Sequence, residues 1–227
     1  MCNIETFGGI QLVNADCMEV LRSLPDKSFD LAIVDPPYGI NAANIFGGET
    51  RKSGNGCANK TAFEKKDWDK TPPPVEYFEE LFRVSKNQII WGANHFISRM
   101  PVDSSCWVCW DKDNGTTKFA DCELAWTSFD KAARLYKYTW NGMLQGNMKK
   151  KEQRIHPTQK PIALYGWLLN TFAEPGNKIL DTHLGSGSIC VAAHDLGFEL
   201  LGIELDPVYY NAAKQRLLYH QAQLGLF

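Results

Sequence analysis

The run Leu31-Ala32-Ile33-Val34, followed by an acid and two prolines, limits the fold more than any other part of the chain. Four consecutive apolar residues are typical of a short strand buried on both faces, and such strands occur in parallel sheets with helices on either side. Similar runs alternate with helical patterns along the chain. They predict six more strands, at 10–14, 88–91, 107–110, 124–128, 178–180 and 199–203, and helices at 17–24, 75–84, 161–172, 188–196 and from 207 onwards. The sequence therefore predicts a doubly wound α/β sheet of seven strands, whose ligands bind beyond the carboxyl ends of the strands.

The length of 227 residues predicts a single domain, 1–227, and the composition excludes several classes of protein. Hydrophobic residues make up 44% and charged residues 22%, so a disordered or coiled-coil chain is excluded. No apolar run approaches the roughly 18 residues of a membrane span. Residues 1–5 lack the layout of a secretory signal. We therefore expect a cytoplasmic protein with no membrane partner.

The seven cysteines are an odd number scattered along the chain, which suits a reducing compartment rather than a disulfide framework. Cys106 and Cys109 have the spacing of a metal-ligand pair, with Cys122 and His95 as candidate partners. However, the chain has no second pair of this kind, and the Trp-rich run around the two cysteines predicts a buried strand. We expect no metal site.

Two polar stretches interrupt the alternation of strands and helices. Residues 41–74 are rich in Gly, Asn and Lys and predict a long loop. Residues 129–155 are polar and basic, with aromatic residues interleaved. Ordered domains rarely carry loops of this length without a function, so we expect both insertions to be functional.

Asp35-Pro36-Pro37-Tyr38 directly follows the first predicted buried strand. Two prolines can simply end a strand, but the motif also suits chemistry on the exocyclic amine of a nucleobase. The lone pair of that amine is delocalised into the ring, so an enzyme needs an acceptor for each N–H before the nitrogen can attack. Asp35 and the Pro36 carbonyl supply two acceptors, and Tyr38 offers a ring face for stacking. Positioning and electrostatics suffice for such a reaction, without a metal or a covalent intermediate.

Residues 179–188 predict a strand that leads through a glycine turn into a helix. A dinucleotide site would have a third glycine where Cys190 stands, and a phosphate loop would have Gly-Lys-Ser/Thr, which is absent. The remaining interpretation is a backbone that touches a small cofactor, with Asp181 at the strand end. Glu204 ends the next predicted strand, where ribose hydroxyls are usually held; on its own it would be an ordinary exposed acid.

A third motif, residues 154–161, reads Arg-Ile-His-Pro-Thr-Gln-Lys-Pro just before a predicted helix. It is a helix start in structural terms. It also places Thr158 and Lys160 where a cofactor carboxylate could sit.

Together these three motifs resemble the amino-methyltransferases of DNA that use S-adenosylmethionine. That family carries an Asp-Pro-Pro-Tyr motif, a strand with a Gly-x-Gly turn, and a His-Pro-Thr-x-Lys-Pro stretch. Here the catalytic motif comes first, as in the permuted beta class. The resemblance runs from about Leu12 to Leu217 and implies a Rossmann-like mixed sheet with a circularly permuted motif order. The chain departs from the family at Thr182 and His183, where Pro and Phe are common, and at Ser188, where Thr is common.

The resemblance implies a role for each matching residue. The catalytic motif would be Asp35, Pro36, Pro37 and Tyr38, which grip and stack a flipped base. Asp16 would contact the adenine of S-adenosylmethionine, Glu204 its ribose and Asp181 its amino group. The full implied cofactor set is Asp16, Asp35, Thr158, Lys160, Asp181, His183, Gly185, Ser186, Gly187, Ser188 and Glu204.

The stretch from Asp130 to Lys160 is basic, with eight Lys or Arg residues against two acids in a chain of net charge −2. Most runs of charge are solvated surface, but this one falls where the permuted family places its target-recognition region. We therefore expect it to bind DNA phosphates. Its shortness suggests a homodimer, and a cognate restriction endonuclease is a further candidate partner. The candidate DNA contacts are Arg134, Lys137, Lys149, Lys150 and Lys151.

The first residue of the catalytic motif bears on the target base. Asp resembles enzymes that methylate the N6 amine of adenine, whereas Ser is commoner in those that methylate the N4 amine of cytosine. No cysteine follows a proline, which disfavours methylation at carbon 5 of cytosine. The sequence predicts a site-specific DNA adenine-N6 methyltransferase. The alternatives are the same chemistry on cytosine, RNA or a protein glutamine, and a non-catalytic nucleic-acid-binding relative.

Overall fold

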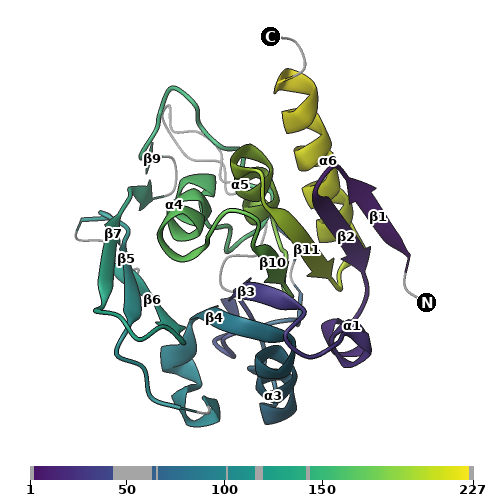
Figure 1. Cartoon of the computed structure of the whole chain (residues 1–227). Coiled ribbons are helices and arrows are strands. Elements are labelled where there is room, and N and C mark those ends of the chain that lie inside the picture. The colour runs from purple at the N-terminus through teal and green to yellow at the C-terminus, as the bar shows by residue number, and fades with distance from the viewer. Residues whose placement is uncertain are drawn as a thin grey trace.

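Strands and helices alternate around one mixed sheet in the computed structural model, which describes residues 3–42, 63–64, 66–100, 102–115, 120–141 and 144–224 (Figure 1). Within these residues the sheet has nine strands in the order β1-β2-β11-β10-β3-β4-β6-β5-β7. The strands from β2 to β4 in this order are parallel, while β1 and β6 run antiparallel to their neighbours. The strands of this sheet are β1 (Ile4–Phe7), β2 (Ile10–Asn14), β3 (Phe29–Val34), β4 (Ser85–Trp91), β5 (Trp107–Asp111), β6 (Cys122–Thr127), β7 (Arg134–Lys137), β10 (Lys178–Asp181) and β11 (Glu199–Glu204).

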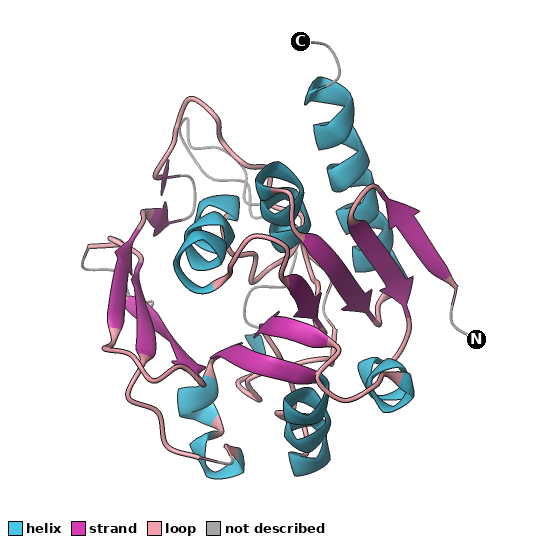
Figure 2. Cartoon of the chain, viewed as in Figure 1, coloured by secondary structure: helices cyan, strands magenta, loops and turns pink. Residues whose placement is uncertain are grey.

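Helices cover both faces of the sheet (Figure 2). One layer contains α4 (Ile162–Phe172), α5 (Ser188–Leu196) and α6 (Pro207–Leu224), and the other contains α1 (Cys17–Ser23) and α3 (Val75–Val84). Short helices η1 (Ala93–His95) and η2 (Ile97–Arg99) follow β4, and a small hairpin is formed by β8 (Trp140–Asn141) and β9 (Leu144–Gln145). No helix in the described part of the chain is long and apolar enough to cross a membrane.

The apolar run of β3 is buried on both faces, as its sequence predicts. Leu31 and Ile33 belong to the core under α4–α6, while Ala32 and Val34 belong to the core under α1 and α3. In this parallel sheet β10 lies between β3 and β11. The end of β3, which leads into Asp35, is therefore brought beside two strand ends that come much later in the chain.

All seven predicted strands are present, but the expected number of strands was too low. The two additional strands, β1 and β7, lie at the two edges of the sheet. Edge strands have one neighbour and a solvated face, so they lack a strong apolar signature; β7 reads Arg-Leu-Tyr-Lys and is mostly exposed. Part of the predicted insertion 129–155 therefore belongs to the sheet. The predicted loop 41–74 lies largely outside the described residues.

Candidate catalytic and cofactor site

Asp35 leaves the carboxyl end of β3 with both carboxylate oxygens hydrogen-bonded by neighbouring side chains. The Tyr38 hydroxyl donates to Oδ1 at 2.6 Å, and the Lys160 Nζ lies 2.5 Å from Oδ2. Lys160 Nζ also donates to the Tyr38 hydroxyl at 3.1 Å. Burial raises the pKa of Asp35, and Lys160 opposes that effect. The predicted catalytic acid is thus a confined carboxylate at the expected edge of the sheet.

Lys160 does not occupy the position that the sequence analysis gave it. Instead of facing a free space for a cofactor carboxylate, its ammonium points to three protein acceptors, of which the third is Glu123 Oε2 at 3.1 Å. Lys112 lies 2.5 Å from the other oxygen of Glu123. Burial works against ionisation of Glu123, but the two lysines outweigh it and hold its pKa at about 2. Glu123 was not predicted, because it lies just before the predicted strand 124–128 and no motif marks it.

A second missed residue, Asp69, holds the backbone that follows the catalytic motif. Its Oδ1 accepts hydrogen bonds from the N–H groups of Tyr38 at 2.6 Å and Gly39 at 2.9 Å, and its Oδ2 accepts one from Ala42 at 2.7 Å. The Asp69 side chain is buried, so these three donors have a partner that water cannot replace. Asp69 therefore fixes the path of the chain beyond the prolines. Nothing in the polar loop sequence marks this acid.

The ring of Tyr38 packs in parallel against the exposed ring of His95 in η1. Their centroids are 5.2 Å apart and their planes differ by 16°. Gly92 has a φ of +69°, and a Cβ there would lie 2.1 Å from the Tyr38 ring, so glycine is required for this close approach. The ring face that a base would use is thus covered by a solvent-exposed side chain.

Asp181 ends β10 with one unpaired carboxylate oxygen. Its Oδ1 accepts the His183 N–H at 3.0 Å, while its buried Oδ2 has no hydrogen-bond partner among the described residues. Burial raises the pKa of Asp181 to about 8, and the like charges of Asp35 and Glu204 add to this effect. The charges of Asp35 and Glu204 thus act on Asp181 at the ends of neighbouring strands. An unpaired buried acid is costly unless a donor or a cation completes it.

The predicted glycine turn brings its backbone to Glu204. Gly185 N–H donates to Glu204 Oε2 at 2.8 Å, and Asp206 N–H donates to Oε1 at 2.9 Å. Gly185 and Gly187 both have positive φ, and a Cβ on Gly187 would lie 2.8 Å from the Cβ of Ala213 in α6. The turn thus needs glycine both for its conformation and for its packing against α6.

The two serines of this turn serve the protein's own hydrogen bonds. Ser186 and Ser188 hydroxyls lie 3.0 Å apart, and Ser188 donates to the Lys160 carbonyl at 2.7 Å. Arg216 in α6 donates to both serines and pairs with Glu152 at 2.6 Å. Their side chains therefore tie the turn to the segment before α4.

The remaining predicted cofactor residues surround the same strand ends. Asp16 caps α1, accepting the Met18 N–H at 2.7 Å. His183 is hydrogen-bonded to Thr182 at 2.9 Å, and burial lowers its pKa to about 4, so it is neutral at pH 7. Thr158 contacts Nδ1 of the buried His156 at 3.2 Å.

The predicted DNA contacts lie on the exposed side of the last strands. Arg134 and Lys137 belong to β7, which runs parallel to β5. Arg134 lies level with Trp91 at the end of β4, and Lys137 lies beyond that end. Lys137 pairs with Asp113 at 2.8 Å. The three lysines that follow β9 are exposed: Lys149, Lys150 and Lys151. The segment that carries them is closed by hydrogen bonds from Trp140 to the Gln159 carbonyl and between Gln145 and Glu152.

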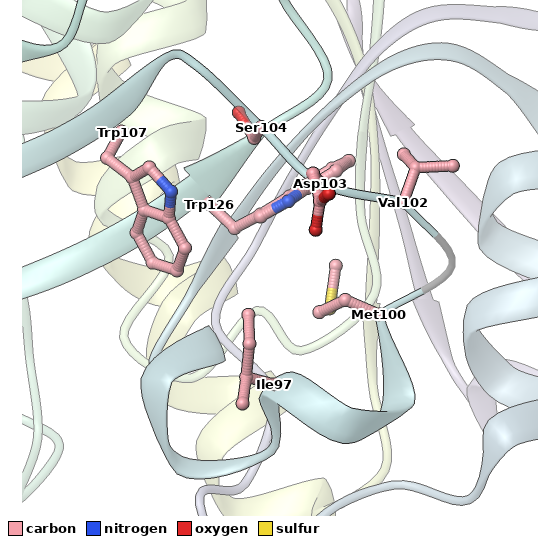
Figure 3. A pocket seen from close by; sticks show the side chains of 7 residues that line it. All are labelled: Ile97, Met100, Val102, Asp103, Ser104, Trp107 and Trp126. Carbon is pink, nitrogen blue, oxygen red and sulfur yellow. The ribbon is translucent and has the colours of Figure 1, made fainter.

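An open groove of about 570 Å³ lies away from these residues, between η2, the start of β5 and the end of β6 (Figure 3). It shares no lining residue with the Asp35 and Asp181 sites. Within the described chain, no three His, Cys, Asp or Glu side chains gather as a metal site requires. The groove is lined by Ile97, Met100, Val102, Asp103, Ser104, Trp107 and Trp126.

The acids at the ends of β3, β10 and β11 fit a cationic cofactor. S-adenosylmethionine carries a positive sulfonium and a positive ammonium group, and its ribose offers two hydroxyl donors. The unpaired Oδ2 of Asp181 is the observation that tests this fit, because it lacks the donor that an ammonium group would supply. Glu204 retains acceptor capacity beyond its two backbone N–H donors.

Comparison with known proteins supports the same assignment. Residues 90–215, more than half of the chain, match the family described as DNA methylase (N6_N4_Mtase). The chain is 26% identical to the type II methyltransferase M.HinfI of Haemophilus influenzae over 91% of this chain and 67% of that protein. Its fold is similar to that of M1.HpyAVI in complex with S-adenosylmethionine (TM-score 0.55, 21% identity, 92% and 100% of the two chains). It is also similar to the cytosine-N4-specific PvuII DNA methyltransferase (TM-score 0.58, 13% identity, 94% and 90% of the two chains).

The family match begins after the Asp35 motif and includes both the glycine turn and the His156-Pro157-Thr158 stretch. The fold agrees with it. The chain therefore belongs to the N6/N4 family of DNA methyltransferases, which are S-adenosylmethionine-dependent enzymes.

Proposed function

We propose that this enzyme methylates the N6 amine of adenine in DNA, with Asp35 as the residue that grips the amine. The observation that carries the proposal is the confined Asp35 carboxylate at the end of β3, next to the strand that carries Asp181. Family membership supports DNA as the substrate. The choice of adenine rests on Asp at the first position of the motif.

The acids beyond the sheet edge would hold the cofactor. S-adenosylmethionine supplies, when bound, a methyl group activated by its sulfonium charge. In our proposal Asp181 binds the ammonium group through Oδ2, Glu204 accepts hydrogen bonds from the ribose hydroxyls, and Asp16 lies at the adenine. The N-terminal end of α5, with its free backbone N–H groups, favours the cofactor carboxylate.

Asp35 and Pro36 would prepare the target nitrogen. One N–H of the amine donates to Asp35 and the other to the Pro36 carbonyl, which draws the lone pair out of the ring and directs it at the methyl group. The bond from the nitrogen to the methyl carbon would form as the bond from that carbon to the sulfonium sulfur breaks, which would leave a neutral thioether. The nitrogen would then give up a proton, and Asp35 is the nearby acceptor. The raised pKa of Asp35 favours this transfer. Tyr38 would provide the stacking surface once the His95 ring has moved off it.

Cytosine-N4 methylation is the second candidate, favoured by the likeness of the fold to the PvuII enzyme. The N4 amine of cytosine also has two N–H groups, so the same two acceptors suit it. Incubation with labelled S-adenosylmethionine and DNA of mixed sequence, followed by digestion to nucleosides, separates the two. We expect label in N6-methyldeoxyadenosine; label only in N4-methyldeoxycytidine would overturn the choice of adenine.

The role of Asp35 is tested by Asp35→Ala. We expect turnover to fall roughly 10³-fold, because a preorganised acceptor for the reacting amine is lost. Cofactor affinity, measured by calorimetry, should stay within a few-fold of wild type. The matched control is Asp26→Ala, at an exposed position before β3, which should leave turnover unchanged. Normal turnover by the Asp35 variant would refute the proposal.

A further inference from the structure

The carboxylate of Glu123 reaches the catalytic edge from a different part of the sheet. Glu123 is the second residue of β6, which runs antiparallel to β4, so the start of β6 lies beyond the end of β4. From there Glu123 shares the ammonium group of Lys160 with Asp35. Four alternating charges result, in the order Asp35, Lys160, Glu123 and Lys112.

Lys160 is the centre of this chain of charges. Its side chain is only 3% exposed, and its ammonium nitrogen lies 2.5 Å from Asp35 Oδ2, 3.1 Å from Glu123 Oε2 and 3.1 Å from the Tyr38 hydroxyl, to which it donates. Buried ion pairs often give little net stability because both charges lose their hydration. Stability alone therefore does not explain four charges that end on Asp35, and we look for their effect on the reaction.

We propose that Glu123, held by Lys112, is a positioning residue that sets how strongly Lys160 binds Asp35. This inference rests on the proposed function and deepens it. Glu123 draws part of the Lys160 charge away from Asp35, which leaves Asp35 a better acceptor for the amine and its proton. Lys112 acts in the opposite direction, because it neutralises Glu123.

The electrostatics around Asp35 agree with this arrangement. Burial and the negative charge of Glu123 raise the pKa of Asp35, while Lys160 lowers it. The pKa of Glu123 is held low, so it keeps its charge in the pH range in which Asp35 titrates. The groups that face or interact with Asp35 are Tyr38 in the segment after β3, Lys160 just before α4, Tyr165 on α4, Glu123 on β6, Asp181 on β10 and Tyr77 on α3.

The test compares the pH dependence of kcat in Glu123→Gln and Lys112→Gln with that of wild type. In Glu123→Gln, Lys160 pairs with Asp35 alone, which lowers the pKa of Asp35. The acidic limb of the kcat profile should therefore move down by about one pH unit, and kcat on its plateau should fall roughly tenfold. In Lys112→Gln the limb moves to higher pH. Opposite shifts from two neighbouring residues are an effect that a merely structural role would not produce. Glu123→Asp keeps the charge and should keep the limb near its wild-type position.

The control Glu199→Gln makes the same change at an exposed glutamate of β11 and should leave the profile unchanged. The role of Glu123 would be overturned if the acidic limb of kcat stayed at the wild-type pH in both test variants, or moved in the same direction in both. Neither result would contradict adenine methylation. If Glu123→Gln does not fold, Lys112→Gln and Glu123→Asp decide the matter.

Failure of the proposed function gives a different result, namely that wild type forms no N6-methyldeoxyadenosine. The role of Glu123 is then decided by carboxyl ¹³C NMR of Asp35, whose pKa should be lower in Glu123→Gln than in wild type. An unchanged Asp35 titration would overturn it.

Discussion

At the scale of single residues, Asp181 is the acid whose surroundings are least complete. It is buried, one oxygen has no partner among the described residues, and its pKa is raised to about 8. At pH 7 it is therefore mostly protonated, below its folded pKa. A bound ammonium group would favour the carboxylate, so binding must release that proton.

We therefore expect S-adenosylmethionine binding to release roughly one proton per site at pH 7, and this number should fall toward zero by about pH 9.5. The measurement is calorimetry in two buffers of different ionisation enthalpy. Two controls should show no release from Asp181: the variant Asp181→Asn, and 5′-methylthioadenosine, which lacks the amino-acid portion. Equal binding enthalpies in the two buffers for wild type would contradict the assignment.

The sequence identified the residues that chemistry marks by type and position, and missed those that act through the fold. Asp35, Asp181 and Glu204 could be placed together because each follows a strand in one parallel sheet. The partners of Lys160 could not be predicted, because Glu123 comes from an antiparallel strand whose register no motif reveals. Asp69 was hidden in a loop, where an acid that accepts backbone N–H groups looks like any other exposed acid.

At the scale of elements, α5 has a glycine in the left-handed region at each end, and the two differ in what surrounds them. Gly187 precedes the helix and packs on Ala213, whereas nothing lies within 4 Å of a Cβ placed on Gly197. Gly197→Ala should therefore lower the free energy of unfolding only by the backbone strain, about 1 kcal/mol. Gly187→Ala should cost about 2–3 kcal/mol, because the added methyl group also collides with α6.

Urea unfolding of both variants measures this difference. The double variant Gly187→Ala/Ala213→Gly should recover part of the excess, since it removes the Cβ 2.8 Å away. Equal costs at the two glycines would show that the turn does not depend on its contact with α6.

Sequence patterns predict the central strands of the sheet but not the strands at its two edges. The central strands are buried on both faces and were all predicted, although β4 begins at Ser85 rather than near 88. Strand β1 is exposed on one face and half-buried on the other, and β7 is mostly exposed, so neither sequence carries the apolar signature of a buried strand.

At the scale of the whole molecule, the exposed lysines after β9 carry the prediction of DNA binding. Each lysine that contacts a phosphate releases about one counterion on binding. The triple variant Lys149→Gln/Lys150→Gln/Lys151→Gln should therefore lower the salt dependence of DNA affinity, log Kd against log salt, by up to about three units.

Fluorescence anisotropy with one duplex over a range of salt concentrations gives this slope. The control Lys86→Gln/Lys178→Gln changes two exposed lysines at the opposite end of the parallel strands and should leave the slope unaltered. An unaltered slope in the triple variant would place the DNA on another surface. The homodimer and the companion endonuclease remain predictions.

The two donors already bound to Asp35 have a consequence for turnover. The Tyr38 hydroxyl and Lys160 occupy the oxygens of Asp35 that the amine would use in our proposal, so a substrate would have to displace one of these donors. An unmodified amine enters this exchange with two N–H groups, but the methylated product retains one. On the proposed role of Asp35, Tyr38 and Lys160 would therefore compete better against product than against substrate, which would favour release of the product.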